Sequence, residues 1–142
     1  MYANPLQATK HFELSNGIQT DLKSMNPIEF EYYTADILAW RGIKTEVTSA
    51  SSDDGVDIFA VAPDGKKCAV QCKRYSKAIQ PDVLRELSGS QKLHDCDSAL
   101  LVTTSRLTTA ARKTAESLGI DVIDGDHLAT LHIERMNRDG DH

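Results

Sequence analysis

The Pro-Asp-Gly turn within 62–66 constrains the fold of this 142-residue chain more than any other stretch. It lies between two apolar runs, over about 56–62 and 67–74, that have the composition of strands. Proline presets φ, aspartate bonds its own backbone and glycine adopts φ > 0. The turn therefore predicts a β-hairpin with a three-residue loop and a glycine bulge. Both runs carry apolar residues on each face, which is typical of strands in the centre of a covered sheet.

The register of this hairpin decides which polar side chains meet. In a three-residue loop Ala62 faces Lys66, and Asp57 then faces Gln71. Lys73 follows Gln71 by two residues, so it projects from the same face and lies diagonally across from Asp57. A strict two-residue loop would shift the register by one residue and put Asp57 and Gln71 on opposite faces. Polar groups so close to apolar runs cost stability, which indicates a chemical role, and such a role needs the first register.

The segments around the hairpin predict an α/β chain. Strand patterns occupy 43–48, 98–104 and 120–123, and helix patterns occupy 27–40, 81–94, 108–118 and the segment after Asp124 or Asp126. This order combines an antiparallel first half with βαβ-like units. We therefore expect an α/β three-layer sandwich, with a central mixed β-sheet flanked by helices.

We expect one folded domain over residues 25–136, because a chain of this length usually forms one domain. Residues 1–24 are an N-terminal extension, in which 12–22 favour either a short strand or a helix with a break at Asn16-Gly17. Residues 137–142 are polar and predict a frayed, flexible tail. No run is apolar enough to span a membrane and no signal-peptide pattern is visible, so we expect a cytoplasmic protein without a membrane partner.

The first clear helix carries an acid that bears on function. A helix that begins after the Asn26 cap and runs to about Trp40 puts Phe30 and Ile37 on its buried face. Glu31 lies at the edge of that face. Such an acid is either a solvated boundary residue or a group aimed into a cleft, and the sequence alone leaves both interpretations open.

Charge and cysteine content exclude some classes of protein. A net charge of −5 and a pI near 5.5 argue against bulk attraction to nucleic acid. The basic residues within 66–77 form either a local basic surface or a solvated charged face. Three cysteines without a secretory signal argue against a disulfide framework. A zinc site built from Cys68, Cys72, Cys96 and His94 is disfavoured, because no close Cys-x-x-Cys pair is present.

An acid, an amide and a lysine at one place indicate a hard cation and a reacting water, because Mg²⁺ prefers a few protein oxygens and keeps several waters. Asp57 can supply a carboxylate oxygen, Gln71 an amide oxygen and the Cys72 backbone carbonyl a third. Lys73 is placed to position or deprotonate the attacking water or to steady a phosphate, and Glu31 could hold a water beside the metal. These parts predict a phosphodiester hydrolase. The alternative is that Gln71 and Lys73 are exposed edge residues and that Asp57 ends a turn.

The chain resembles the Mrr-like restriction endonucleases, a branch of the PD-(D/E)xK nuclease superfamily, in a D…QxK variant. The matching segments are 26–31, 53–58 and 70–74, with further similarity at 87–89, 101–105, 110–115 and 123–125. No single motif is specific. Their order and spacing over about 25–132 carry the resemblance.

The resemblance implies a restriction-endonuclease-like fold and Mg²⁺-dependent cleavage of DNA, with Mn²⁺ as a substitute ion and no small-molecule cofactor. The catalytic residues that it implies are Asp57 as metal ligand, Gln71 in place of the second acid, Lys73 as the catalytic lysine and Glu31 as the helix acid. Asp53 matches an acid often found just before the catalytic aspartate and is a candidate supporting acid. Gln71 removes one negative charge from the site, so it should weaken cation binding and favours a one-metal site.

We therefore expect a small Mg²⁺-dependent DNA endonuclease of restriction type, resembling type II or type IV enzymes. A homodimer would supply the two active sites that cleavage of both strands requires. Basic side chains are candidates for phosphate contacts, which position DNA without reading its sequence. These are Lys66, Lys67, Arg74, Lys77, Arg106, Arg112 and Lys113. Two alternatives stay open: a DNA-binding or regulatory module of the same fold with little or no turnover, and a structure-specific nuclease that resolves junctions or nicks DNA.

Overall fold

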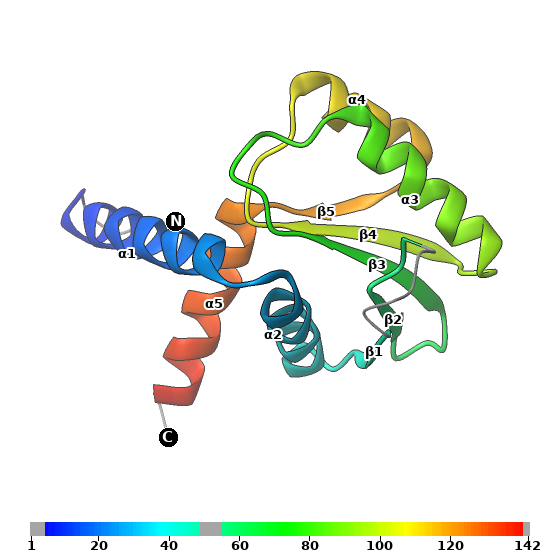
Figure 1. Ribbon diagram of the computed structural model, residues 1–142. Coiled ribbons are helices and arrows are strands. Elements are labelled where there is room, and N and C mark those ends of the chain that lie inside the picture. Colours follow the sequence, from blue (N-terminus) through cyan, green and yellow to red (C-terminus); the bar gives the residue numbers. More distant parts are fainter. Residues whose placement is uncertain (1–4, 49–54, 141–142) are drawn as a thin grey trace.

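The computed structural model describes residues 5–48 and 55–140, and its strands form one sheet between two layers of helices (Figure 1). The helices are α1 (Pro5–Ser24), α2 (Pro27–Trp40), α3 (Pro81–Leu93), α4 (Thr109–Leu118) and α5 (Gly125–Gly140). The strands are β1 (Lys44–Val47), β2 (Ile58–Val61), β3 (Lys67–Lys73), β4 (Ser98–Thr103) and β5 (Asp121–Ile123). Among the helices of these residues, none has the length and apolar character that crossing a membrane requires.

The sheet is mixed, as the sequence predicted. Its strands lie in the order β1-β2-β3-β4-β5. The first three are antiparallel neighbours, while β3, β4 and β5 run parallel and are connected through α3 and α4. Strand β3 is therefore central and has helices over both of its faces, which explains the apolar residues on both of its sides.

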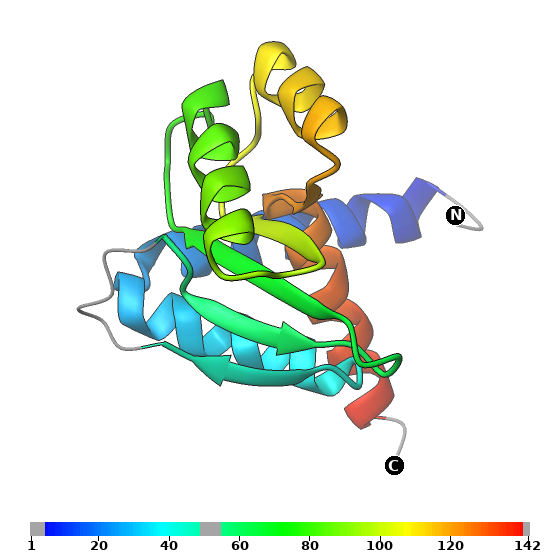
Figure 2. The ribbon, with the colours of Figure 1, turned by 90° about the vertical axis from the view of Figure 1, so that its right-hand side faces the viewer.

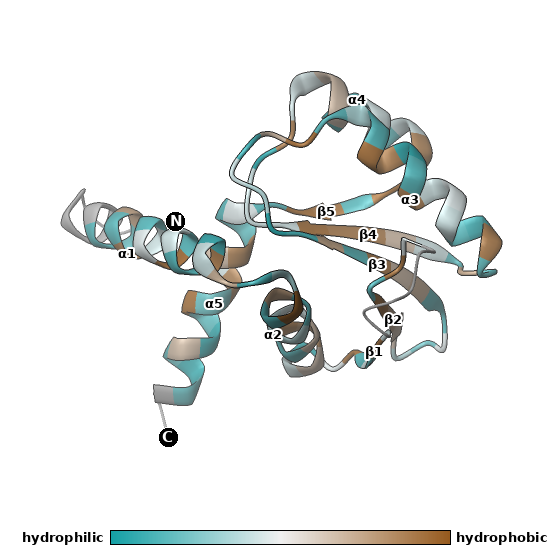
Figure 3. Cartoon of the chain, viewed as in Figure 1, coloured by the Kyte–Doolittle hydropathy of each residue, from teal (hydrophilic) through white to brown (hydrophobic). Residues whose placement is uncertain are grey.

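Each face of the sheet has its own apolar core. Helices α3 and α4 cover one face, where Leu84 packs with Leu101 of β4, and α2 and α5 lie beneath the other (Figure 2). In that second core Phe30, Val70 and Leu128 belong to one buried cluster. Figure 3 shows hydrophobic residues along β3 and β4, between the two helical layers. The two cores together bury the central strands and hold the hairpin in the middle of the fold.

The described part of the N-terminal extension is one continuous helix, α1, so the break expected at Asn16-Gly17 is wrong. Helix α1 lies against α5, with Ile18 and Leu22 buried in the same cluster as Leu128. A Cβ at Gly17 would meet nothing within 4 Å, so this residue faces open space. A glycine inside a helix costs roughly 1 kcal/mol relative to alanine. The long-range packing of α1 offsets this local penalty.

The hairpin has the predicted register. Ile58 pairs with Val70, and the Ala62 N–H donates to the Lys66 carbonyl at 3.0 Å. Gly65 has φ of 86°, as the glycine bulge requires. The regular ladder ends before Asp57, however. The Asp57 N–H donates at 2.9 Å to the Val70 carbonyl, although Val70 already faces Ile58. Asp57 and Ile58 therefore both oppose Val70, which is the pattern of a β-bulge. Such a bulge can change the direction in which the Asp57 side chain points.

The helix ends follow from local chemistry. The Glu29 N–H donates to Asn26 Oδ1 at 2.8 Å, and Glu29 Oε1 accepts from the Asn26 N–H at 3.0 Å, so the predicted Asn26 cap forms part of a capping box. Asp124 caps α5 by accepting from the His127 N–H at 3.0 Å. Helix α5 continues to Gly140, past the point where we expected a frayed tail.

Arg135 links the last turns of α5 to the rest of the fold. Arg135 pairs with Asp36 of α2 at 3.0 Å and with Asp139 at 3.8 Å. These pairs join the end of α5 to α2 and to its own last turn. The pair with Asp36 leaves no local sequence pattern because the two residues are far apart in the chain, whereas Asp139 follows Arg135 by one helical turn.

Candidate active site

Asp57 is fixed at the end of the hairpin by its carboxylate. Oδ2 accepts a hydrogen bond from the Cys72 backbone N–H at 2.7 Å. In a regular antiparallel ladder that N–H would bond to a carbonyl of the neighbouring strand. The bulge removes this partner, and the Asp57 carboxylate takes its place. The side chain is therefore held by the central strand itself.

The backbone around Asp57 is held from the other side by Thr48, which follows β1. The Thr48 N–H donates to the Asp57 carbonyl at 2.9 Å. The Thr48 hydroxyl donates to the Val56 carbonyl at 2.8 Å. β1 and β3 thus both restrain the segment that carries the acid, so its geometry is set before any ligand binds.

Glu31 lies beside Asp57, which answers the question that the sequence left open. The buried face of α2 includes Thr34 and Leu38, and Glu31 stands at the edge of this part of the helix. Burial, the negative charge of Asp57 and a hydrogen bond to Asp57 raise the pKa of Glu31 to about 7. The same acids, after burial, raise the pKa of the Cys72 thiol. The charges of Glu31, Asp57 and the Cys72 thiol at the end of β3 therefore influence one another.

Gln71 is the buried amide of the site, with 6% of its surface exposed. Its Oε1 is buried and has no hydrogen-bond partner among the described residues. Buried amide oxygens normally have partners, so an orphaned one requires an explanation such as a bound ion or water.

The space beside Gln71 is closed by a glycine. A Cβ at Gly55 would lie 2.7 Å from Ser90 Oγ on α3 and 3.8 Å from Gln71 Nε2, and Gly55 has φ of 73°. The chain therefore passes between Gln71 and α3 only because residue 55 lacks a side chain. Gln71 lies on the face covered by α3, whereas Glu31 comes from α2. Glu31 was expected from the helix, and it lies beside the Asp57 carboxylate from that side. That Asp57, Gln71 and Lys73 act from one sheet face stays a prediction.

Lys73 has a fixed backbone and a side chain that lies beside an aromatic ring. Its carbonyl accepts from the Thr103 hydroxyl at 2.7 Å and from the Thr104 N–H at 3.2 Å. Its Nζ lies 5.5 Å from the centroid of the Tyr75 ring. In the described part of the chain, Lys73 makes no ion pair with Asp57 or Glu31.

The oxygen donors fit a hard cation. Asp57 supplies a carboxylate, and Gln71 supplies an amide oxygen that lacks a partner among the described residues. Within 5–48 and 55–140 there is no group of three or more His, Cys, Asp or Glu residues that could hold a metal. A zinc-type cluster is therefore absent from these residues. A metal at this place would need the amide oxygen of Gln71 as a ligand. The candidate supporting acid, Asp53, lies outside the described residues.

The basic residues do not form one surface. Lys66 and Lys67 lie at the turn, about 20 Å from Lys73 along β3. The Arg74 guanidinium donates to the Lys23 carbonyl at 3.2 Å, and Arg112 pairs with Asp124 at 2.9 Å. Three candidates remain. Lys77 and Arg106 line separate pockets near the ends of β3 and β4, and Lys113 is exposed on α4.

Sequence reasoning missed two residues of the site, Tyr75 and Thr48. Tyr75 follows Lys73 by two residues, and an exposed aromatic so close to a candidate catalytic lysine was an available signal. Thr48 had no signal, because its role depends on a bulge that the sequence pattern did not predict.

The chain matches a known family over most of its length. The sequence model of the restriction endonuclease family Mrr_cat covers residues 22–132. Among curated proteins, the type IV methyl-directed restriction enzyme EcoKMrr of Escherichia coli (strain K12) is 26% identical over 129 residues. That alignment covers 85% of this chain and 42% of the relative, so the chain spans less than half the length of the curated protein it matches.

Two solved structures share the fold. The DNA modification-dependent restriction endonuclease AspBHI superposes with a TM-score of 0.64 and 18% identity, over 92% of this chain and 36% of that one. The MspJI restriction endonuclease, solved in complex with a 27-mer oligonucleotide, gives a TM-score of 0.53 and 15% identity, over 92% and 32% of the two chains. Similarity at these identities establishes the fold alone.

The mixed sheet and its two helical layers thus define a restriction-endonuclease-like fold of the PD-(D/E)xK type. The chain belongs to the restriction endonuclease family of Mrr type. The family resemblance and the fold class expected from the sequence are both confirmed.

Proposed function

We propose that this chain is a Mg²⁺-dependent DNA endonuclease that hydrolyses phosphodiester bonds. One observation carries the proposal: a fixed carboxylate and a buried amide oxygen without a described partner lie at the end of the same hairpin. Membership of a nuclease family supports the same chemistry. A role as an ordinary structural acid would not explain the orphaned oxygen of Gln71.

Asp57, Gln71 and the backbone carbonyl of Cys72 would hold the metal. Mg²⁺ is the natural ion for such oxygen donors, and Mn²⁺ is expected to substitute. When bound, the metal supplies Lewis-acid polarisation of the phosphate. Because Gln71 is neutral, this donor set has one charge fewer than a pair of acids would give, which favours a single ion.

The chain's own residues would do the rest. Lys73 has no carboxylate partner among the described residues, so its ammonium group is free to orient a water or to contact the phosphate. Glu31 has a pKa of about 7, so near neutral pH it can hold or release a proton beside Asp57. The Glu31 carboxyl group would orient a water. Asp53 is proposed as a supporting acid from its sequence position.

DNA is the proposed substrate, and a homodimer is the proposed form for cutting both strands. The names of EcoKMrr and AspBHI describe restriction enzymes directed to methylated or modified DNA, and MspJI was solved with an oligonucleotide. Of the basic candidates, Lys77 and Arg106 lie near the ends of β3 and β4 and suit phosphate contacts best.

One specific observation supports a second candidate. Because residue 71 is a glutamine and not an acid, the described residues contain no cluster of three metal-binding acids. A DNA-binding or regulatory module without turnover does not need such a cluster. The two functions differ in a single property, because only a nuclease breaks phosphodiester bonds.

Nicking of supercoiled plasmid separates the two functions. We expect the wild type to nick with Mg²⁺ and to stop with EDTA, and Asp57→Ala and Lys73→Ala to be roughly 100-fold slower or more. Asp64→Ala and Lys44→Ala are matched controls, because both residues are exposed toward the far end of the hairpin. If the wild type cuts no form of DNA, or if the site variants cut as fast as the controls, the catalytic assignment is contradicted.

A further inference from the structure

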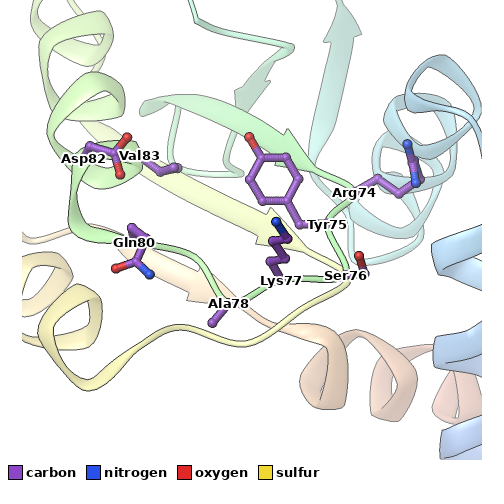
Figure 4. Close-up of a pocket in the computed structure, with 8 residues that line it drawn as sticks. All are labelled: Arg74, Tyr75, Ser76, Lys77, Ala78, Gln80, Asp82 and Val83. Atoms are coloured by element: carbon purple, nitrogen blue, oxygen red, sulfur yellow. The ribbon is translucent and has the colours of Figure 1, made fainter.

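A pocket of about 630 Å³ opens next to Lys73, between the segment that follows β3 and the first turn of α3 (Figure 4). Its size lies within the range of about 300–1,000 Å³ that is typical of small-molecule sites. All of its lining residues come from the stretch 74–83, and neither Asp57 nor Glu31 is among them. It is therefore a compartment beside the proposed reaction centre.

Tyr75 forms one wall of this pocket. The side chain is 40% exposed, although a large aromatic ring is usually covered. Figure 4 shows the ring standing above the chain, with the Lys77 ammonium group directed toward it. The catalytic candidate Lys73 has its Nζ 5.5 Å from the centroid of the same ring. An aromatic face flanked by two ammonium groups suits a flat ring next to a phosphate.

The wall is built into the fold and is not a loose loop. The Thr104 hydroxyl donates to the Tyr75 carbonyl at 2.8 Å, and the Ser105 hydroxyl donates to the Lys77 carbonyl at 2.7 Å. Both hydroxyl residues are buried at the end of β4. The segment that carries Tyr75 and Lys77 is thus anchored to the sheet, so the pocket is preorganised.

The opposite side of the pocket offers polar groups above an apolar floor. Val83 is buried and supplies apolar surface. Gln80 occupies the N-cap position of α3, but its side chain makes no capping hydrogen bond. Asp82 lies in the first turn of α3 and is exposed. An amide and a carboxylate can together accept from, and donate to, the edge of a heterocycle.

We propose that this pocket holds one unpaired DNA base next to the phosphate that Lys73 contacts, an inference that rests on the proposed nuclease function. In an intact duplex both faces of a base are stacked and its pairing edge is used, so only a base outside the stack can enter. Tyr75 would stack on the base and Lys77 would contact its phosphate. Asp82 accepts hydrogen bonds only, so it favours adenine or cytosine, whose exocyclic amino group carries two N–H donors, over thymine, whose single N3–H lies between two carbonyl oxygens that repel a carboxylate.

Binding in EDTA tests this proposal without cleavage. The full chain is titrated by fluorescence anisotropy against a duplex with one unpaired adenine, the same duplex with an unpaired thymine, and the fully paired duplex. We expect the tightest binding to the unpaired adenine. Tyr75→Ala should reduce this preference over the paired duplex by roughly 5- to 150-fold, the range for one base–aromatic stack. Tyr75→Phe should retain it.

Two further variants separate the pocket from general damage. Tyr32→Ala removes another exposed tyrosine, on α2, and should change nothing. Asp82→Asn leaves the Tyr75–Lys73 contact intact and should reduce the preference for adenine over thymine. Equal binding to unpaired and paired DNA, or a preference that survives Tyr75→Ala, overturns the proposal.

The same duplexes, incubated with Mg²⁺, distinguish this failure from failure of the nuclease assignment. A wild type that prefers the unpaired base but never cuts supports the pocket and contradicts the nuclease. A wild type that cuts but binds all three duplexes equally contradicts the pocket alone.

Discussion

The Asp57 carboxylate accepts a 2.7 Å hydrogen bond from the Cys72 backbone N–H and so replaces a backbone carbonyl that a regular hairpin would provide. The Asp57 side chain thereby ends the β2–β3 ladder, and its carboxylate is fixed at the end of the central strand β3. The neighbouring backbone is restrained by Thr48. The position of the proposed metal ligand is therefore set by backbone pairing, which suits a preorganised site.

The charge at Glu31 should make stability depend on pH in the metal-free protein. Its pKa is about 7 in the fold and 4.5 ordinarily, so the folded state binds more protons between these values. Stability therefore falls as pH rises from 4.5 to 7, and the penalty persists above pH 7. Because Glu31 is only partly buried, we expect Glu31→Gln to stabilise by about 1 kcal/mol at pH 8 and by little at pH 4.

Urea unfolding in EDTA at the two pH values measures this difference. Glu46→Gln, at an exposed position of β1, is the control and should give no pH-dependent gain. A Glu31→Gln variant that gains equally at both pH values would contradict the raised pKa.

Gln71→Glu tests whether the amide is a metal ligand. A carboxylate at this buried position should lower stability by about 1–3 kcal/mol without metal. Ligand charge strengthens cation binding, so Mg²⁺ should bind roughly 10-fold more tightly than to the wild type. Thermal unfolding across a Mg²⁺ titration measures both effects. Adding Asp57→Asn should abolish the gain, and an identical Mg²⁺ response in all variants would show that Gln71 does not touch the ion.

Gly55→Ala should close the space beside Gln71. Its φ of 73° costs an L side chain about 1 kcal/mol, and its Cβ would lie 2.7 Å from Ser90 Oγ. Gly65→Ala, with φ of 86° and nothing within 4 Å of the added Cβ, measures the backbone strain alone. We expect Gly55→Ala to destabilise by about 1 kcal/mol more than Gly65→Ala in urea unfolding. Adding Ser90→Ala should recover that excess, and no recovery would contradict the steric account.

Thr48→Val should loosen the segment that carries Asp57. The variant keeps the shape but loses the hydroxyl that donates to the Val56 carbonyl at 2.8 Å, which should cost about 1 kcal/mol. Plasmid nicking should slow as well, because Asp57 becomes less well positioned. Thr114→Val removes a hydroxyl that bonds within α4 and is the control, with nicking unchanged. Equal nicking by the two variants would mean that Thr48 is only structural.

Local chemistry explains what the sequence predicted well. The Pro63-Asp64-Gly65 turn specifies the hairpin register through its own dihedral angles, and the observed pairing of Ile58 with Val70 follows from it. The Asn26 and Glu29 capping box likewise needs only residues of one turn. The register brought the polar residues to one end of the sheet, which was enough to predict a candidate site.

Long-range contacts account for what the sequence did not predict. The bulge at Asp57 depends on a carboxylate that reaches Cys72, and α1 stays continuous because Ile18 and Leu22 pack near α5. Ile18 and Leu22 have helical spacing, but the helix that they pack against is more than 100 residues further along the chain, and the reach of Asp57 to Cys72 leaves no pattern at all. The unpartnered oxygen of Gln71 is a property of the folded core, so no spacing rule could have indicated it.

The rate of Mg²⁺-dependent nicking of supercoiled plasmid by Asp57→Asn tests the central claim most directly. Asparagine keeps the size of Asp57 and an oxygen that can accept from the Cys72 N–H, so the fold is retained and only the charge is lost. We predict a rate roughly 100-fold or more below that of the wild type, with an unfolding transition in EDTA no lower than that of the wild type, because the repulsion between Asp57 and Glu31 is removed. A variant that nicks at the wild-type rate would show that this carboxylate has no part in catalysis.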